Sequence, residues 1–200
     1  MGSPETVSVG LLGGSFDPVH NGHLAIAQSF LNSGVIAELW ILLTPDPPHK
    51  IEHSQAPYDL RLQMLKQAFQ EWENLVVSDV ENHLPSPSYT LQTLAYLTQE
   101  YPNITFYLCM GEDSACNFTQ WHKWQDILTH CNLLIARRPS DSLPDLDPRV
   151  AEHAEFVEHD AVDISSTDIR ESLSENQDIS ELVPKVVQDI IAKQNLYKAQ

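Results

Sequence analysis

Four short apolar runs, each followed closely by Gly, Pro or polar residues, constrain the fold of this chain more than any other feature. They cover Val7–Leu12, Glu38–Leu43, Ile104–Met110 and Asn132–Ala136. Runs this short, bounded by residues that interrupt regular structure, are typical of buried strands rather than helices. We therefore expect strands at these four places, and two shorter ones at Leu75–Ser78 and Ala154–Glu158.

Segments of helical periodicity lie between and after these runs. We predict helices at His23–Leu31, Tyr58–Gln70, Tyr89–Glu100, Ser165–Leu173 and Pro184–Gln194, and a surface loop at Ser140–Arg149. Alternating strands and helices indicate an α/β fold, in which a doubly wound parallel sheet carries helices on both faces. The chain has 200 residues, of which 42% are hydrophobic. We expect a single domain over 1–200, with a helical C-terminal part from about residue 165.

The charge balance limits the classes of partner. The chain has 28 acidic residues against 11 Lys and Arg, and its formal net charge is −17. So acidic a protein is poorly suited to nucleic acid or to an anionic membrane, and no stretch approaches the ~20 apolar residues of a spanning helix. Its three cysteines lack CxxC spacing and suit reduced thiols. We expect a cytoplasmic protein that binds small molecules, and the sequence leaves homo-oligomerisation open.

The stretch GGSFDPVHNGH, residues 13–23, directly follows the first apolar run. Glycines after a strand allow a tight turn and a close approach of the backbone to a phosphate. The helix predicted next would present free N–H groups and the positive end of its dipole. His20 and His23 stand three residues apart near that end, where both can face one ligand. A lone HxxH pair is more often two surface histidines, but the Gly-Gly turn favours a phosphate site.

Two other functions of this stretch are less favoured. Asp17, His20 and His23 could hold a metal, but no other carboxylate cluster supports such a site. A hydride-transferring dinucleotide fold expects G-x-G-x-x-G, whereas GLLGGSFDP lacks the third glycine at the right step.

A second motif, ISSTDIR, covers residues 164–170. Its hydroxyl residues can cap a helix, and that is the ordinary interpretation of such a stretch. The functional interpretation is a second anion site, in which hydroxyls, backbone N–H groups and the Arg170 guanidinium grip phosphate.

Together, the two motifs resemble the signatures of the nicotinate mononucleotide adenylyltransferases, members of the HxGH-type nucleotidyltransferase superfamily. The resemblance runs from about Val7 to Tyr197. Further similar segments stand in the same order as in the family: PPHK at 47–50, SYT at 88–90, Gly111 with Asp113, Trp121, RRP at 137–139, and the closing LVPKVVQDIIAKQNLY. It implies a Rossmann-like sheet of the nucleotidyltransferase type. It also implies a reaction of NAD biosynthesis, in which nicotinate mononucleotide attacks the α-phosphorus of ATP to give nicotinate adenine dinucleotide and pyrophosphate.

The resemblance also implies residue roles. The catalytic residues would be His20, His23 and Arg170. ATP would be bound by these three and by Gly14, Ser15, Phe16, Gly111, Asp113, Ser165 and Ser166. The pyridine nucleotide would be bound by Lys50, Thr90, Trp121 and Arg138. Mg²⁺ would arrive with ATP, with no metal site in the protein itself. For Lys50 and Trp121, an ordinary exposed lysine and core packing with Trp124 remain alternatives.

Other functions also remain open. The same chemistry could act on nicotinamide mononucleotide, since a small backbone shift near Thr90 or Trp121 would change the preference for acid or amide. A phosphopantetheine adenylyltransferase fits less well, because the resemblance includes the ISSTDIR and Trp121 segments. A nucleotide-binding module without turnover is disfavoured by the presence of His20, His23 and Arg170. Glu112 departs from the family pattern, in which a small or uncharged residue is common.

Overall fold

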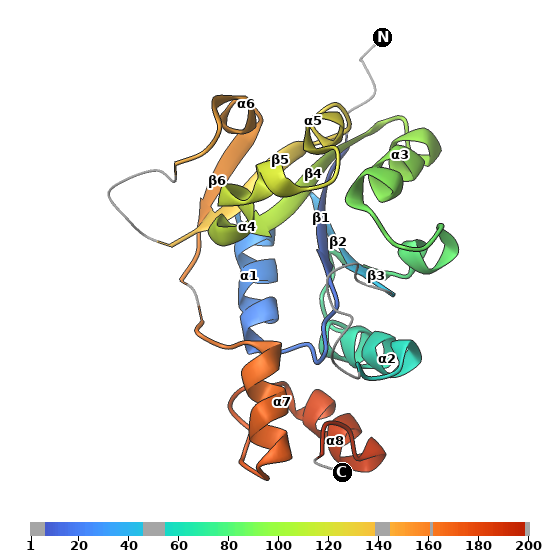
Figure 1. Cartoon of the computed structure of the whole chain (residues 1–200), viewed down its shortest axis with the longest axis vertical. Coiled ribbons are helices and arrows are strands. Elements are labelled where there is room, and N and C mark those ends of the chain that lie inside the picture. The colour runs from blue at the N-terminus through green and yellow to red at the C-terminus, as the bar shows by residue number, and fades with distance from the viewer. Residues whose placement is uncertain (1–6, 46–54, 139–144, 161, 199–200) are drawn as a thin grey trace.

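The computed structural model describes residues 7–45, 55–138, 145–160 and 162–198 (Figure 1). Its centre is a six-stranded sheet in the order β3-β2-β1-β4-β5-β6, in which every pair of neighbouring strands is parallel. The strands are β1 Val7–Gly14, β2 Glu38–Leu43, β3 Leu75–Ser78, β4 Ile104–Gly111, β5 Asn132–Arg137 and β6 Ala154–Glu158. All six predicted strands are confirmed, and β1, β4 and β5 continue slightly beyond their predicted ends.

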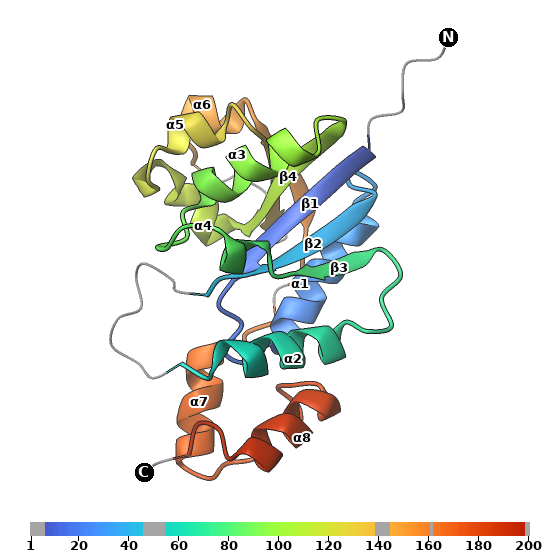
Figure 2. The same cartoon turned by 90° about the vertical axis from the view of Figure 1, so that its right-hand side faces the viewer.

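Helices cover both faces of the sheet, as Figures 1 and 2 show. Four of them pack into the core on one face: α1 Asn21–Asn32, α2 Tyr58–Ala68, α7 Ser166–Ser174 and α8 Lys185–Gln194. The other face carries α3 Thr90–Glu100 and the short helices α4 Glu112–Cys116, α5 Trp124–Ile127 and α6 Pro148–Ala151, with the 3-10 turns η1 Val80–His83 and η2 Phe118–Gln120. The predicted Rossmann-like doubly wound α/β fold is therefore confirmed.

The alternation of side chains along the strands explains this two-sided packing. In β2, Leu39, Ile41 and Leu43 are buried in the core beneath α1 and α2, whereas Leu42 belongs to the core beneath α3. Successive residues of a strand point to opposite faces, so a continuous apolar run supplies two cores at once.

The five predicted helices are confirmed with small changes at their ends, but the short helices were not predicted. A helix of one turn has no periodicity that a sequence can display. The prediction of a loop over Ser140–Arg149 is wrong at its end, where Pro148–Ala151 form α6. The Asp147 carboxylate accepts a 2.9 Å hydrogen bond from Arg149 N–H and caps this helix, with Pro148 at its first position.

The strand order places a switch point between β1 and β4. The chain leaves β1 toward α1 on one face and leaves β4 toward α4 on the other face. In open parallel sheets, ligands bind in the crevice that such divergence creates at the carboxyl ends of the strands. Within the part of the chain that the structure describes, no helix is long and apolar enough to cross a membrane.

Candidate active site

The turn after β1 is held in place by a buried arginine, Arg61 of α2. Its side chain donates to the carbonyl oxygens of Ser15 at 2.8 Å and Thr44 at 3.0 Å. It also donates to the carbonyls of Ala56 and Pro45, each at 3.0 Å. A rigid fork of N–H donors can satisfy several carbonyls at once, so Arg61 joins the ends of β1 and β2 to α2. The sequence did not predict this role.

Asp17 is a second buried polar residue in the same turn. Its Oδ1 accepts a 3.1 Å hydrogen bond from Ala56 N–H and a 2.6 Å hydrogen bond from the Tyr197 hydroxyl. The carboxylate therefore joins the turn to Ala56, which precedes α2, and to Tyr197, which follows α8. The described residues contain no group of three or more His, Cys, Asp or Glu side chains arranged to hold a metal. The structure thus gives Asp17 a different role from the metal ligand considered above.

His20 and His23 lie against each other at the start of α1. Their ring centroids are 3.7 Å apart with an interplanar angle of 30°, and the edge of Phe16 meets His23 at 4.8 Å. The backbone N–H of His20 donates to His23 Nδ1 at 3.2 Å. Because Nδ1 accepts, neutral His23 carries its proton on Nε2, which makes Nε2 a hydrogen-bond donor.

Burial gives His20 unusual electrostatics. Its side chain is only 6% exposed, and removal from water lowers its pKa to about 4. His20 is therefore neutral at pH 7. Its buried Nδ1 has no hydrogen-bond partner among the described residues. A buried polar atom without a partner costs stability, and a ligand that bonds to Nδ1 would recover that cost.

The second motif docks directly onto the first. Ser166 Oγ donates to the Pro18 carbonyl at 2.9 Å, and Arg170 Nη1 donates to the Asp17 carbonyl at 2.8 Å. Ser165 caps α7, since its Oγ accepts from Asp168 N–H at 3.1 Å. GGSFDPVHNGH and ISSTDIR, about 150 residues apart in the chain, therefore form one structural unit. The capping prediction for Ser165 is confirmed, and its contact with ATP stays a prediction.

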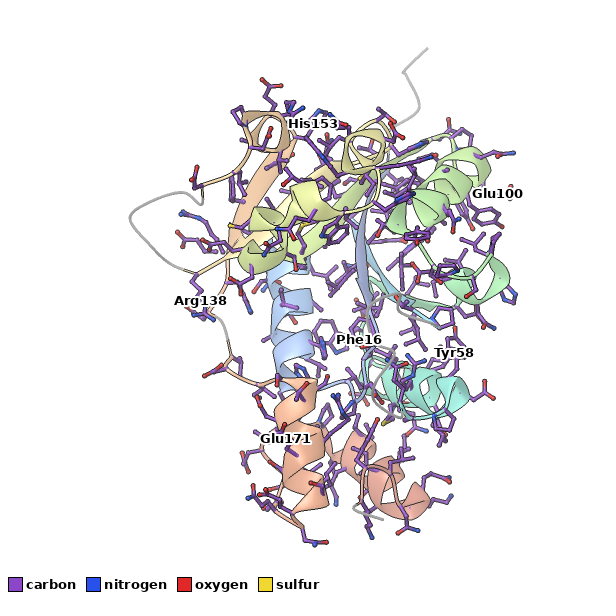
Figure 3. All side chains as sticks on the ribbon, viewed as in Figure 1. Phe16, Tyr58, Glu100, Arg138, His153 and Glu171 are labelled. Carbon is purple, nitrogen blue, oxygen red and sulfur yellow. The ribbon has the colours of Figure 1, made fainter. Side chains whose placement is uncertain are left out.

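A cavity of about 780 Å³ opens at the carboxyl ends of the strands. Predicted site residues that line it are His20, His23, Gly111, Asp113 and Arg138, and the other lining residues are Gly22, Ile26, Glu112, Ala136, His159, Val162 and Ile164. An added Cβ on Gly111 would meet nothing within 4 Å, so this glycine leaves open space beside the cavity. Figure 3 shows Arg138 at the periphery of the molecule, on the segment that follows β5.

The other predicted site residues lie around this cavity or apart from it. Gly14 ends β1 and Ser15 and Phe16 begin the turn, where Phe16 is buried with a φ of 44°. Thr90 begins α3, and Trp121 packs on Phe118 at 5.3 Å between ring centroids. The rings of Tyr89 and His122 lie 4.7 Å apart, which brings these two segments together. Lys50 lies outside the described residues.

Sequence reasoning missed four residues of the site. These are Arg61, the Asp17 carboxylate in its structural role, Tyr197 and His159. Arg61 was detectable, because it is one of only 11 Lys and Arg residues and interrupts the apolar face of a predicted helix. The contacts of the other three join segments far apart in sequence, and no local pattern indicates them.

Comparisons with known proteins identify the family of this chain. The cytidylyltransferase-like family model matches residues 11–172. A probable nicotinate-nucleotide adenylyltransferase of Shewanella pealeana is 34% identical over 96% of this chain and 96% of the relative. One of Bacteroides fragilis is 38% identical over 85% of this chain and 84% of the relative. These matches confirm the resemblance that the two motifs indicated.

Solved structures confirm the fold. Nicotinic acid mononucleotide adenylyltransferase of Plasmodium falciparum, solved with NaAD, superposes with a TM-score of 0.79 at 22% identity, covering 96% of this chain and 97% of that one. A putative nicotinate-nucleotide adenylyltransferase of Vibrio parahaemolyticus gives a TM-score of 0.72 at 18% identity, covering 97% of each. The chain belongs to the cytidylyltransferase-like family and, within it, to the nicotinate-nucleotide adenylyltransferases that it matches over most of its length.

Proposed function

We propose that this protein transfers the adenylyl group of ATP to nicotinate mononucleotide, giving nicotinate adenine dinucleotide and pyrophosphate. The observation that carries the proposal is the stacked His20–His23 pair at the start of α1, joined to ISSTDIR through Arg170. The names of the relatives, which match at 34% and 38% identity, support the choice of substrates.

The reaction forms one bond and breaks another at the same phosphorus. A phosphate oxygen of the mononucleotide attacks the α-phosphorus of ATP, and the bond from that phosphorus to the bridging oxygen breaks. The electron pair of the broken bond leaves with pyrophosphate. Such a transfer needs alignment and charge stabilisation rather than covalent help from the protein. Holding both substrates in line can supply roughly 7–11 kcal/mol of the barrier.

The two histidines are suited to charge stabilisation. The Nε2–H of His23 is a donor that does not depend on an added proton, since Nδ1 already accepts from the His20 backbone. The neutral ring of His20 lies beside it at the positive end of the α1 dipole. Fixed donors of this kind, aimed at developing negative charge, are each worth about 10²–10³ in rate.

The turn and ISSTDIR would hold the triphosphate. We assign the β- and γ-phosphates to Ser165, Ser166 and Arg170, next to the Gly14–Ser15 turn. The contacts of Arg170 with the Asp17 carbonyl and the Thr167 hydroxyl fix its guanidinium in place. A guanidinium has five N–H donors, so donors remain for phosphate. Gly111 and Asp113 would contact the adenosine.

Magnesium belongs to the substrate in this proposal. The described residues offer no ready cage of carboxylates, and Mg²⁺ is commonly held through substrate phosphates with few protein ligands. We therefore expect the ion to enter with ATP and to neutralise part of the triphosphate charge.

The pyridine nucleotide would be bound by Lys50, Thr90, Trp121 and Arg138. We also propose that the chain acts in the cytoplasm as one domain.

The direct test of the activity is to incubate the protein with MgATP and nicotinate mononucleotide and to identify the products by mass spectrometry. We expect dinucleotide and pyrophosphate in equal amounts. Hydrolysis of ATP without dinucleotide would contradict the proposal.

A further inference from the structure

His159 is a cavity residue to which neither sequence motif assigns a role. It directly follows β6, and its backbone N–H donates to the Arg137 carbonyl at the end of β5, at 2.9 Å. It lines the cavity together with Gly111, Asp113, Val162 and Ile164. The residue is therefore fixed by the sheet and borders the space that a ligand would fill.

The hydrogen bonds of the imidazole assign its tautomer. His159 Nδ1 lies 3.0 Å from Ser29 Oγ, and the same hydroxyl donates to the Ala25 carbonyl of α1 at 3.2 Å. A serine hydroxyl has one proton to donate. Both hydrogen bonds form together only if Ser29 donates to Ala25 and Nδ1 of His159 donates to Ser29, so we assign the proton to Nδ1. Nε2 of the neutral ring is then a hydrogen-bond acceptor, on the side of the ring away from Ser29.

The surroundings of His159 suit a nucleobase better than a phosphate. Val162 and Ile164 offer apolar surface, and Gly111 leaves open space. Glu112, Asp113 and Arg138 line the same cavity, so two carboxylates accompany one guanidinium there, a charge balance that suits a neutral base better than phosphate oxygens. The phosphate-binding groups of the site, around His23 and Arg170, belong to the turn after β1 and to α7.

Resting on the proposed function, in which ATP is the nucleotide, we propose that His159 determines base specificity by accepting a hydrogen bond at Nε2 from the exocyclic amine of adenine. Adenine presents a donor at this position, whereas guanine and hypoxanthine present a carbonyl oxygen. Two facing acceptors cannot bond, so a 6-oxopurine would leave both groups unpaired. Ser29 is the positioning residue that holds the tautomer.

Burial supports the neutral form of the ring that this recognition needs. Partial removal from water lowers the pKa of His159, an effect that the nearby Asp160 charge opposes. At pH 7 and above, the ring is neutral and Nε2 keeps its lone pair.

The test compares two nucleotides that differ only in the amine. kcat/KM is measured at pH 7.5 with ATP and with purine riboside triphosphate, which has hydrogen in place of the amine. His159→Phe keeps a ring but removes the acceptor. We expect it to lower kcat/KM for ATP by about 3- to 10-fold, the worth of one hydrogen bond, and to leave the other nucleotide nearly unchanged. Ser29→Ala should shift the ratio in the same direction by less.

Two further variants complete the design. His159→Gln offers an amide oxygen as acceptor and should keep most of the preference for ATP. His153→Phe is the matched control and should leave both nucleotides unaffected, because His153 precedes β6, at the other end of that strand from His159, and is not among the residues that line the cavity. Equal losses for both nucleotides in His159→Phe, or no loss, would overturn the proposal.

The outcome separates this proposal from the proposed function. If the wild-type protein forms no dinucleotide from ATP, the proposed function fails, and binding of the two nucleotides is measured by calorimetry instead. A preference for ATP that His159→Phe removes would then support base recognition at this residue. Equal affinities in the wild-type protein would contradict it.

Discussion

The hydroxyl of Tyr197 donates a 2.6 Å hydrogen bond to the carboxylate of Asp17. This bond joins the C-terminal segment to the turn between β1 and α1. Arg170 and Ser166 also contact the turn, because their side chains donate to its Asp17 and Pro18 carbonyls. Burial, and then the adjacent Asp17 charge, raise the pKa of Tyr197, so its hydroxyl keeps its proton throughout the physiological range. The turn that presents the two histidines is therefore fixed from several sides.

Tyr197→Phe is expected to weaken both the fold and the site. The change removes one of the two hydrogen bonds that the structure gives Asp17 Oδ1, and an under-satisfied buried carboxylate costs about 1.5–3 kcal/mol. The free energy of unfolding, measured in urea, should fall by this amount, and kcat should fall because the turn is less firmly positioned. Tyr96→Phe, at an exposed position on α3, is the matched control. Equal stability of the two variants would contradict this role of Tyr197.

Arg61→Lys is predicted to be damaging although it keeps the charge. A lysine cannot supply the fork of donors that reaches the Ser15, Thr44 and Pro45 carbonyls together. We expect a loss of about 2–4 kcal/mol in the free energy of unfolding, because buried carbonyls lose their donors. Thermal unfolding of Arg61→Lys and of Arg149→Lys, an exposed arginine on α6, provides the comparison. Similar melting temperatures for both would show that the fork is not needed.

The low pKa of His20 makes stability depend on pH. Its pKa is about 4 in the folded protein, against 6.5 for a histidine in the unfolded chain. Well above pH 6.5, neither state binds the proton. Between pH 6.5 and about 4 the unfolded state binds it preferentially, so stability falls as the pH falls. From pH 7 to pH 5, we expect the wild type to lose about 2 kcal/mol more than His20→Gln.

Urea unfolding at these two pH values checks this prediction. His83→Gln is the control, because His83 is exposed at the end of η1. The control variant should keep the pH dependence of the wild type, and His20→Gln should lose part of it. The same slope in all three proteins would contradict a buried, neutral His20.

His23→Ala should separate catalysis from binding. If its Nε2–H stabilises charge that develops only in the transition state, kcat falls about 10²–10³-fold, while KM for nicotinate mononucleotide changes little. Arg170→Ala provides the contrast, since a group that grips ground-state phosphates mainly raises KM for ATP. Steady-state kinetics of both variants test the assignment. A near-normal kcat in His23→Ala would remove the transition-state role.

The fold was largely predictable from the sequence because its signals are local. Buried strands such as β4 and β5 appear as continuous apolar runs, and α3 shows clear periodicity. The glycines and histidines of the turn after β1 lie within eleven residues, so their geometry follows from one short segment. The same holds for Ser165, which caps the helix that its own motif begins.

What the sequence could not predict depends on contacts between distant segments. The bond between Asp17 and Tyr197 spans 180 residues, and that between Ser29 and His159 spans 130. No periodicity or motif links such pairs, since each appears only once the strands are ordered. The short helix α6 depends on its Asp147 cap, and α5, which has no side-chain cap, depends on the packing of its buried Ile127.

The most direct test of the central claim is pyrophosphate release with MgATP, measured in parallel with nicotinate mononucleotide and with nicotinamide mononucleotide. We predict rapid release with the acid and at least about tenfold lower kcat/KM with the amide, the effect of one charge-assisted hydrogen bond. Equal or faster release with the amide would contradict the proposed substrate, and release with neither would contradict adenylyl transfer to a pyridine nucleotide.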